Sequence, residues 1–355
     1  MKNNYLSKIT ELPPPHFSEA LRFSWTRRFT VLLIFALALL FSGCDVLKSL
    51  GLLPNDDPEP APHVWGVPVQ GAEEKLSIKE KFGVTEPGTA GVDAAFRELS
   101  AFIKGGGLEE DLKKDLNKRV IKTGDWIDLE DGLIVANYVN LGGVNHAGTA
   151  QAFDGTPLLR LIVVGINSFQ SKEGAETYTY PAGDETPPPH VVFQFQNIPA
   201  QRRLDSAMGT NGGYPAKELS AYVNVNFLKG LTDAGVPDSV LWGPKRVLSK
   251  GQNNGADVVS HKLWVPTERE MMGTATYSSS GETAVNQARL EYYQTALSRI
   301  KYTGTSALRY WESTASGSNG ARFCYVENNG STGHFDGNVD SGVSPAFCVV
   351  AEQLP

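Results

Sequence analysis

The sequence lacks the motifs on which most enzyme chemistry depends. It contains no Gly-x-Ser-x-Gly, His-Glu-x-x-His, Cys-x-x-Cys or Walker-loop pattern, and its 6 histidines do not cluster. It has only 3 cysteines, and with 41% hydrophobic and 20% charged residues it is neither a low-complexity chain nor a polytopic membrane protein. We therefore expect a chain that buries a core but is not an enzyme and needs no cofactor.

The nearest approach to a metal motif is Asp336-x-Asn338-x-Asp340, which imitates the opening of a calcium-binding loop. The sixth position of such a loop needs glycine and here holds Ser341, and the twelfth needs glutamate and here holds Phe347. The stretch is more typical of a solvated turn, so we predict no metal site.

The charge of the chain argues against nucleic acid as a partner. The formal net charge is −7, and residues 1–43 hold five basic and two acidic side chains, which leaves −10 for the remainder. An acidic chain is repelled by phosphate backbones.

The N-terminal region resembles a bacterial lipoprotein signal. Arg27-Arg28 precedes an apolar run over 29–41, about 13 residues long and too short for a comfortable membrane span, and Ser42-Gly43-Cys44 follows. The resemblance implies a signal peptide over 1–43, cleavage before Cys44 and lipid attachment to that residue, so that the bilayer is a partner. The alternative is an uncleaved anchor helix. Both interpretations put the chain in the cell envelope, on the outer membrane or a periplasmic face.

Residues 44–90 are rich in proline and acidic residues, which predicts a flexible tether. A helical segment over 91–120 follows, because apolar residues at 92–103 recur with helical spacing and Gly105-Gly106-Gly107 ends the pattern. Residues 108–119 are a weaker helix candidate.

From residue 121 to 355 the pattern predicts one α+β domain. We expect strands at 125–129 and 133–138, a central strand buried on both faces at 158–166, and a strand at 190–198. Helices are predicted from Tyr214-Pro215, from a Thr267–Glu270 capping box and over 284–300, followed by short strands from 308 onward. Helices in the middle and strands at both ends favour α+β over a doubly wound sheet.

Several stretches resemble a bacterial domain family of unknown function that is abundant in treponeme-type spirochaete lipoproteins and in gut bacteria and their phages. They include the runs at 263–271, 310–313 and 323–326, and the closing Gly342-Val-Ser-Pro-Ala-Phe-Cys348. Earlier runs at 92–103, 124–129, 158–168 and 191–199 also look like treponeme members, so the similarity covers most of 92–350. The family has no assigned reaction.

The same layout is similar to the C-type-lectin-like domains of variable receptor proteins, some of which are diversified by retroelements. This resemblance implies a mixed or antiparallel sheet with flanking helices, in which 158–166 lies beside 346–350, and ligand binding on the strands and loops between. A resemblance to formylglycine-generating enzymes is weaker, since their closing Gly-Phe-Arg is missing.

Residues 313–342 have the composition of an adaptable binding surface, with six glycines, five serines and four asparagines around aromatic and charged side chains. The variable-looking surface spans 310–342, and its alternative is ordinary loop-rich surface. Strand alternation puts Cys324 and Val326 in the core and Tyr325 and Glu327 outside, although Phe323 then needs a second packing layer. The candidate ligand-binding residues are Glu312, Arg322, Tyr325, Glu327, Asn328, His334, Phe335 and Asn338.

The two C-terminal cysteines, Cys324 and Cys348, lie in apolar strand-like runs. A disulfide between them would close a loop of about 25 residues and contribute roughly 3 to 4 kcal/mol. The alternative is two buried thiols, and we expect Trp264 and Trp311 to be core residues. Three functions stay open: a lipoprotein that binds a protein or glycan, a structural envelope lipoprotein without a ligand, and a relative of formylglycine-generating enzymes with an exposed cysteine pair.

Overall fold

The structure, a computed structural model, describes residues 76–133, 138–139, 145–146, 159–170, 186–251, 255–278, 282, 289–304 and 306–352. The predicted signal peptide, Cys44 and most of the predicted tether lie outside the described residues. Within these ranges, no helix has the length and apolar character needed to cross a membrane.

The helical segment that precedes the sheets is centred on one long helix. Helix α4 (Gly88–Lys104) buries its apolar stripe, as predicted for 92–103, and Gly105 is its C-cap. It is preceded by α3 (Ile78–Lys81) and followed by α5 (Gly107–Leu112) and a 3-10 turn, η1 (Leu116–Lys118), where the weaker helix was predicted.

The larger sheet has six strands and is antiparallel at every pairing. Its order is β1 (Trp126–Leu129), β4 (Leu159–Ile166), β5 (Val191–Phe195), β17 (Ala346–Val349) and β10 (Leu263–Trp264), and β7 (Leu241–Trp242) also pairs with β17. The strands predicted at 158–166 and 346–350 therefore share one sheet. They are not neighbours, since β5 lies between them and pairs with both.

Side chains cover this sheet on both faces, which explains its nearly continuous apolar strands. On one face the ring of Phe96 from α4 packs 5.3 Å from Phe193, and Phe227 packs 5.4 Å from Phe195. Phe227 belongs to a continuous helical stretch formed by α6 (Glu218–Tyr222), a π turn, η3 (Val223–Phe227), and α7 (Leu228–Asp233). The other face contributes Ile162 and Val192 to a second apolar cluster around Trp264.

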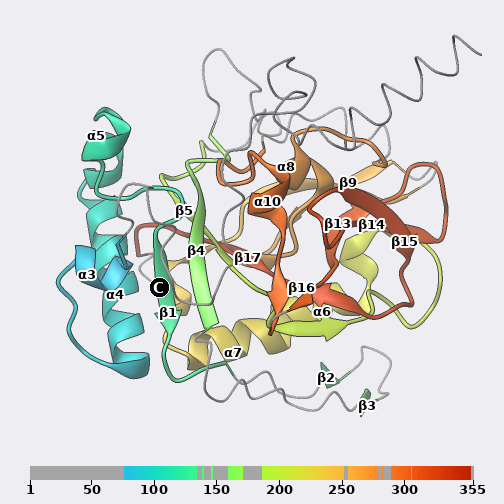
Figure 1. Cartoon of the computed structure of the whole chain (residues 1–355), viewed down its shortest axis with the longest axis horizontal. Coiled ribbons are helices and arrows are strands. Elements are labelled where there is room, and N and C mark those ends of the chain that lie inside the picture. Colours follow the sequence, from blue (N-terminus) through green and yellow to red (C-terminus); the bar gives the residue numbers. More distant parts are fainter. Residues whose placement is uncertain are drawn as a thin grey trace, which may run out of the picture. The chain divides into compact units, whose positions relative to one another are not determined.

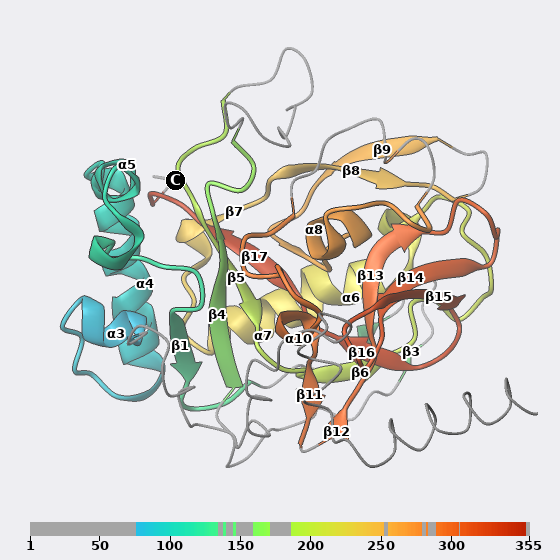
Figure 2. The same ribbon diagram turned by 45° about the horizontal axis from the view of Figure 1, so that its top comes forward.

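The smaller sheet has five strands in the order β15 (Thr332–Asp336), β14 (Arg322–Val326), β13 (Tyr310–Ala315), β16 (Ser341–Val343) and β6 (Ala200–Arg202). Only the β13–β16 pairing is parallel. Figures 1 and 2 show β13, β14 and β15 side by side at the end of the molecule opposite α4.

Short elements lie in the connections between the strands of the two sheets. They are η2 (Tyr214–Ala216), η4 (Asp238–Val240), α8 (Glu268–Met272), α10 (Ala296–Arg299) and the strand pairs β2–β3 (Tyr138–Val139, Asn145–His146), β8–β9 (Lys245–Ser249, Ala256–Ser260) and β11–β12 (Tyr302–Thr303, Ser306–Ala307). The capping box at Thr267 and Glu270 is present as predicted. The helix predicted over 284–300 is wrong for its described part, where only the four residues of α10 are helical. The described chain is thus α+β with mainly antiparallel sheets.

Candidate functional site

The predicted binding residues lie on or beside the β14–β15 hairpin at the edge of the smaller sheet. The strands pair with Arg322 opposite Asp336, Cys324 opposite His334 and Tyr325 opposite Gly333. The connecting turn uses Gly330 at φ 79°, and the Glu327 N–H donates to the Ser331 carbonyl at 2.7 Å. A tight turn between two β-prone runs fixes the register, and with it the face on which each side chain lies.

One group of side chains at this hairpin comes from three separate segments, and we call it the His334 cluster. Its members are Arg322, His334 and Asp336 on the hairpin, together with Tyr277 and Ser316. The ring of Tyr277 stacks on His334 with centroids 4.4 Å apart, and the Ser316 Oγ lies 3.1 Å from His334 Nδ1. Arg322 Nη1 lies 3.4 Å from His334 Nε2, while its Nε donates to Asp336 Oδ1 at 3.2 Å. Burial and the nearby Arg322 lower the pKa of His334. The cluster is only partly covered, since the Arg322 and Asp336 side chains are 39% and 37% exposed.

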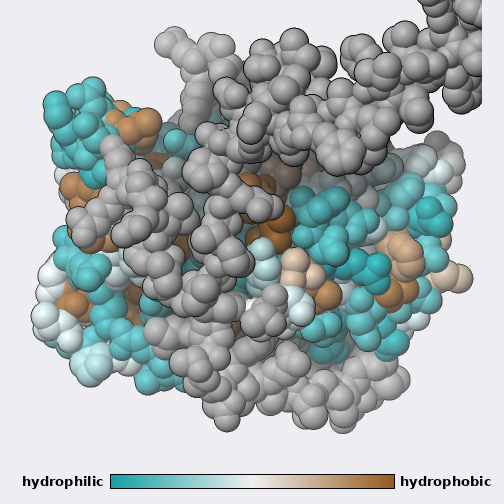
Figure 3. Space-filling view, viewed as in Figure 1, coloured by the Kyte–Doolittle hydropathy of each residue, from teal (hydrophilic) through white to brown (hydrophobic). Residues whose placement is uncertain are grey.

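A second group faces away from the His334 cluster. The Tyr325 hydroxyl donates to Glu327 Oε1 at 2.6 Å, and burial together with this carboxylate raises the pKa of Tyr325 to about 12. Phe335 is 37% exposed, and the Arg309 guanidinium lies 4.9 Å from the centre of its ring. On the face drawn in Figure 3, the end that carries β13–β15 shows mostly hydrophilic residues with a small hydrophobic group among them.

The prediction that Tyr325 points outward is wrong. Tyr325 is 7% exposed and packs edge-on against Trp311, in the same apolar cluster as Phe323. Val326 lies in the other apolar cluster, so β14 is covered on both sides and Phe323 has the second packing layer that it requires. The prediction that Trp264 and Trp311 are core residues is confirmed, since they are 0% and 1% exposed.

Three further candidate residues do not join a common surface. Glu312 is 0% exposed on β13, which is incompatible with direct contact to a surface ligand. Asn328 and Asn338 are both exposed, but they lie beyond opposite ends of β15. In the calcium-like stretch, Asp336 is paired with Arg322, and across the described residues no group of three potential metal ligands lies together.

The cysteines are not bridged. Cys324 on β14 and Cys348 on β17 belong to different sheets, and both are free and 0% exposed. Burial raises the pKa of both thiols well above the ordinary value. The possible disulfide is therefore absent, and the alternative of two buried thiols is correct.

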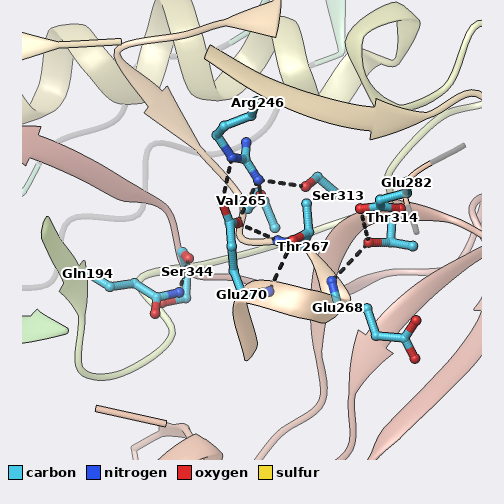
Figure 4. A network of polar contacts seen from close by, with 10 residues as sticks. All are labelled: Gln194, Arg246, Val265, Thr267, Glu268, Glu270, Glu282, Ser313, Thr314 and Ser344. Atoms are coloured by element: carbon cyan, nitrogen blue, oxygen red, sulfur yellow. Dashed lines mark hydrogen bonds and ion pairs between the residues drawn. The ribbon is translucent and has the colours of Figure 1, made fainter. Parts of the chain in front are cut away.

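The interior contains a buried ion pair between Arg246 and Glu270 that the sequence did not reveal (Figure 4). Arg246 on β8 donates through Nε and Nη2 to the two oxygens of Glu270, at 2.8 and 2.7 Å. Its Nη2 also lies 3.2 Å from the Ser313 Oγ on β13. Glu270 in turn accepts from the Thr267 N–H, so the predicted capping box is one end of a network that joins β8, α8 and β13.

Three further glutamates lie buried near this pair. Glu268 accepts from the N–H groups of Tyr277 and Ser278, and Glu282 accepts from the Thr314 hydroxyl at 2.9 Å. Among the described residues, neither carboxyl oxygen of Glu312 has a hydrogen-bond partner. Burial raises the pKa of all three, and repulsion from neighbouring glutamates adds to it for Glu282, whose pKa is about 8, and for Glu312, whose pKa lies well above its ordinary value. Such a concentration of buried acids is typical of functional or strained regions.

A family model described as "Domain of unknown function (DUF6273)" matches residues 190–351. No curated protein and no solved structure matches the chain. The chain thus carries a DUF6273 domain, and this confirms over 190–351 the predicted similarity to a family without an assigned reaction. Strands β1 and β4 lie outside the match, yet β4 pairs directly with β5 inside it.

Proposed function

We propose that this protein is a lipid-anchored lipoprotein of the cell envelope whose DUF6273 domain recognises a protein or glycan through the His334 cluster. The observation that carries the proposal is the cluster itself. His334 stacks on Tyr277 from a distant segment and has a polar contact with Arg322, and both His334 and Arg322 are candidates predicted from the sequence. Recognition surfaces concentrate their binding energy in aromatic and arginine side chains of this kind.

The position of the cluster supports the proposal. In the described part of the chain, β15 is the outermost strand of its sheet, so its polar side chains stand at an edge that a partner can approach. The ring stack and the Arg322–Asp336 pair hold these side chains in place before a ligand arrives, which lowers the entropy cost of binding. Sites on rigid strands are held more accurately than sites on free loops.

We further propose that the domain is C-type-lectin-like. In support, its last strand, β17, pairs with its first, β5, so the two ends of the matched region meet in one sheet. The candidate ligand residues lie on the strands between these two and on the turns that join them. The treponeme-type origin and the lipid anchor at Cys44 rest on sequence resemblance and are part of the same proposal.

The burial of both thiols favours this function over the formylglycine-generating alternative. That chemistry needs an exposed cysteine pair, whereas Cys324 and Cys348 are 0% exposed and lie in different sheets. A high thiol pKa also disfavours the reactive thiolate. A structural lipoprotein without a ligand is the remaining alternative, and the experiment below separates it from a binding module.

The test is to probe arrays of glycans and of purified extracellular proteins with the full processed chain. We compare the wild type with Arg322→Ala and His334→Ala, and we use Lys229→Ala on the exposed side of α7 as the matched control. A ligand that is bound by the wild type and the control, and about 5-fold to 100-fold less well by both cluster variants, supports the proposal. Equal binding by all four proteins, or no ligand on either array, contradicts it.

A further inference from the structure

Glu268 is a buried residue whose carboxylate accepts a hydrogen bond from Tyr277, a member of the His334 cluster. It is the first residue of α8 and is 0% exposed, so its carboxylate needs donors from the protein. It receives the N–H of Tyr277 at 3.0 Å, the N–H of Ser278 at 3.0 Å and the Thr332 hydroxyl at 3.2 Å. One carboxylate therefore joins α8, the segment around Tyr277 and the strand β15.

These contacts determine where Tyr277 lies relative to His334. The N–H of Tyr277 is fixed by Glu268, and its carbonyl accepts from the N–H of Gly317 at 2.7 Å. Both backbone groups of Tyr277 are thus held by elements next to His334. The described part of the segment has little other regular structure, since α8 ends at Met272 and its one strand-like contact among the described residues is the bridge from Ser278 to Ser316.

We infer that Glu268 is the positioning residue of the His334 cluster: its buried carboxylate holds Tyr277 stacked on His334 and so preorganises the ligand surface. The role of Glu268 in ligand binding rests on the proposed function, whereas its role in placing Tyr277 rests on the hydrogen bonds alone. Charge-assisted hydrogen bonds to backbone N–H groups are stronger than neutral ones, so removing the carboxylate deprives three donors of this acceptor and frees the segment. A ligand surface of this kind depends on such supporting contacts as much as on the residues that touch the ligand.

Another interpretation is that Glu268 serves only helix α8. The helix already has its cap, because the Thr267 side chain accepts from the Glu270 N–H and Glu270 accepts in return. The side chain of Glu268 instead contacts residues 9, 10 and 64 positions away. The hydrogen bonds of its carboxylate therefore go to the Tyr277 segment and β15 and not to the helix.

The test reads the ring stack directly and needs no ligand. A tyrosine ring stacked on an imidazole displaces the NMR signals of the imidazole protons, so His334 reports the position of Tyr277. The full chain is labelled in its histidines, the His334 signals are assigned with His334→Gln, and Tyr277→Leu defines the shift expected when the stack is lost. Glu268→Ala should move the His334 signals most of the way to the Tyr277→Leu position, while Glu268→Gln, which keeps an acceptor oxygen, should retain most of the displacement.

Two additional variants keep the result interpretable. Glu312→Gln is the matched control, because it alters a buried glutamate that has no hydrogen bond to the described part of the Tyr277 segment, and it should leave the His334 signals unchanged. Glu268→Asp shortens the side chain by one carbon bond, about 1.5 Å, and should lose much of the stack even where Glu268→Ala does not fold. The inference is overturned if folded Glu268→Ala or Glu268→Asp keeps the wild-type His334 signals. Because no ligand is used, this result is independent of whether the arrays identify a partner.

Discussion

Replacing Glu282 by glutamine should stabilise the protein at neutral pH. Glu282 is fully buried, and burial raises its pKa from 4.5 to about 8. In the unfolded chain the group ionises as the pH rises through 4.5, whereas in the folded protein it keeps its proton until about pH 8. The folded state therefore binds more protons between these values, and stability falls as the pH rises through this window and then levels off.

The magnitude follows from the width of the window. Each pH unit between the two pKa values costs about 1.4 kcal/mol, so at pH 7 the cost of Glu282 is on the order of 3 kcal/mol. Glutamine resembles the protonated acid and can still accept from the Thr314 hydroxyl. The variant should therefore match the wild type near pH 4 and exceed it by up to about 3 kcal/mol at pH 7.

The assay is urea denaturation of the wild type and Glu282→Gln at intervals from pH 4 to pH 9. Glu109→Gln, on the exposed surface of α5, is the control for the loss of one formal charge. The gain in free energy of unfolding should grow with pH only for Glu282→Gln. Parallel curves for the wild type and Glu282→Gln would falsify the claim that Glu282 is buried as a neutral acid.

Three further predictions follow from the same structure and sequence. Cys44→Ala should leave an uncleaved precursor and abolish detergent-phase partitioning, and normal processing of the variant would exclude a lipid anchor at this position. Trp311→Ala should cost about 3 to 5 kcal/mol of unfolding free energy and Tyr325→Ala roughly 2 to 4 kcal/mol, whereas Phe335→Ala should cost less than about 1 kcal/mol. Chemical denaturation measures all three losses. A loss for Tyr325→Ala as small as that for Phe335→Ala would contradict the packing of Tyr325. The two buried C-terminal thiols should be unreactive toward a thiol reagent in the native protein and react only on unfolding, so rapid native labelling would contradict their burial.

Features with a local cause were predictable from the sequence. The helix at 92–103 follows from apolar spacing, and the capping box follows from two residues three positions apart. The central strand at 158–166 follows from an uninterrupted apolar run. Neighbour relations among strands were not predictable in this way, because β5 lies between β4 and β17 through contacts between residues far apart in sequence.

The face of a strand could be predicted only where one side meets solvent. Alternation divides β14 into two sets of residues, and it correctly separates Cys324 and Val326 from Phe323 and Tyr325. It does not say which set is exposed when both are buried. The strand lies between two apolar clusters, so the assumption of a solvent face led to the wrong position for Tyr325.

Glu312 shows why charge is an incomplete guide to exposure. A glutamate between Trp311 and Ser313 suggests surface, because burying an ionised carboxylate is very costly. A carboxyl group avoids most of that cost by keeping its proton. Burial raises the pKa of Glu312 well above its ordinary value and that of Glu282 to about 8, so Glu282 keeps its proton at pH 7. Formal charge counted from composition therefore overstates how many carboxylates a ligand can meet, and at the partly exposed His334 cluster Arg322 pairs with Asp336 beside His334.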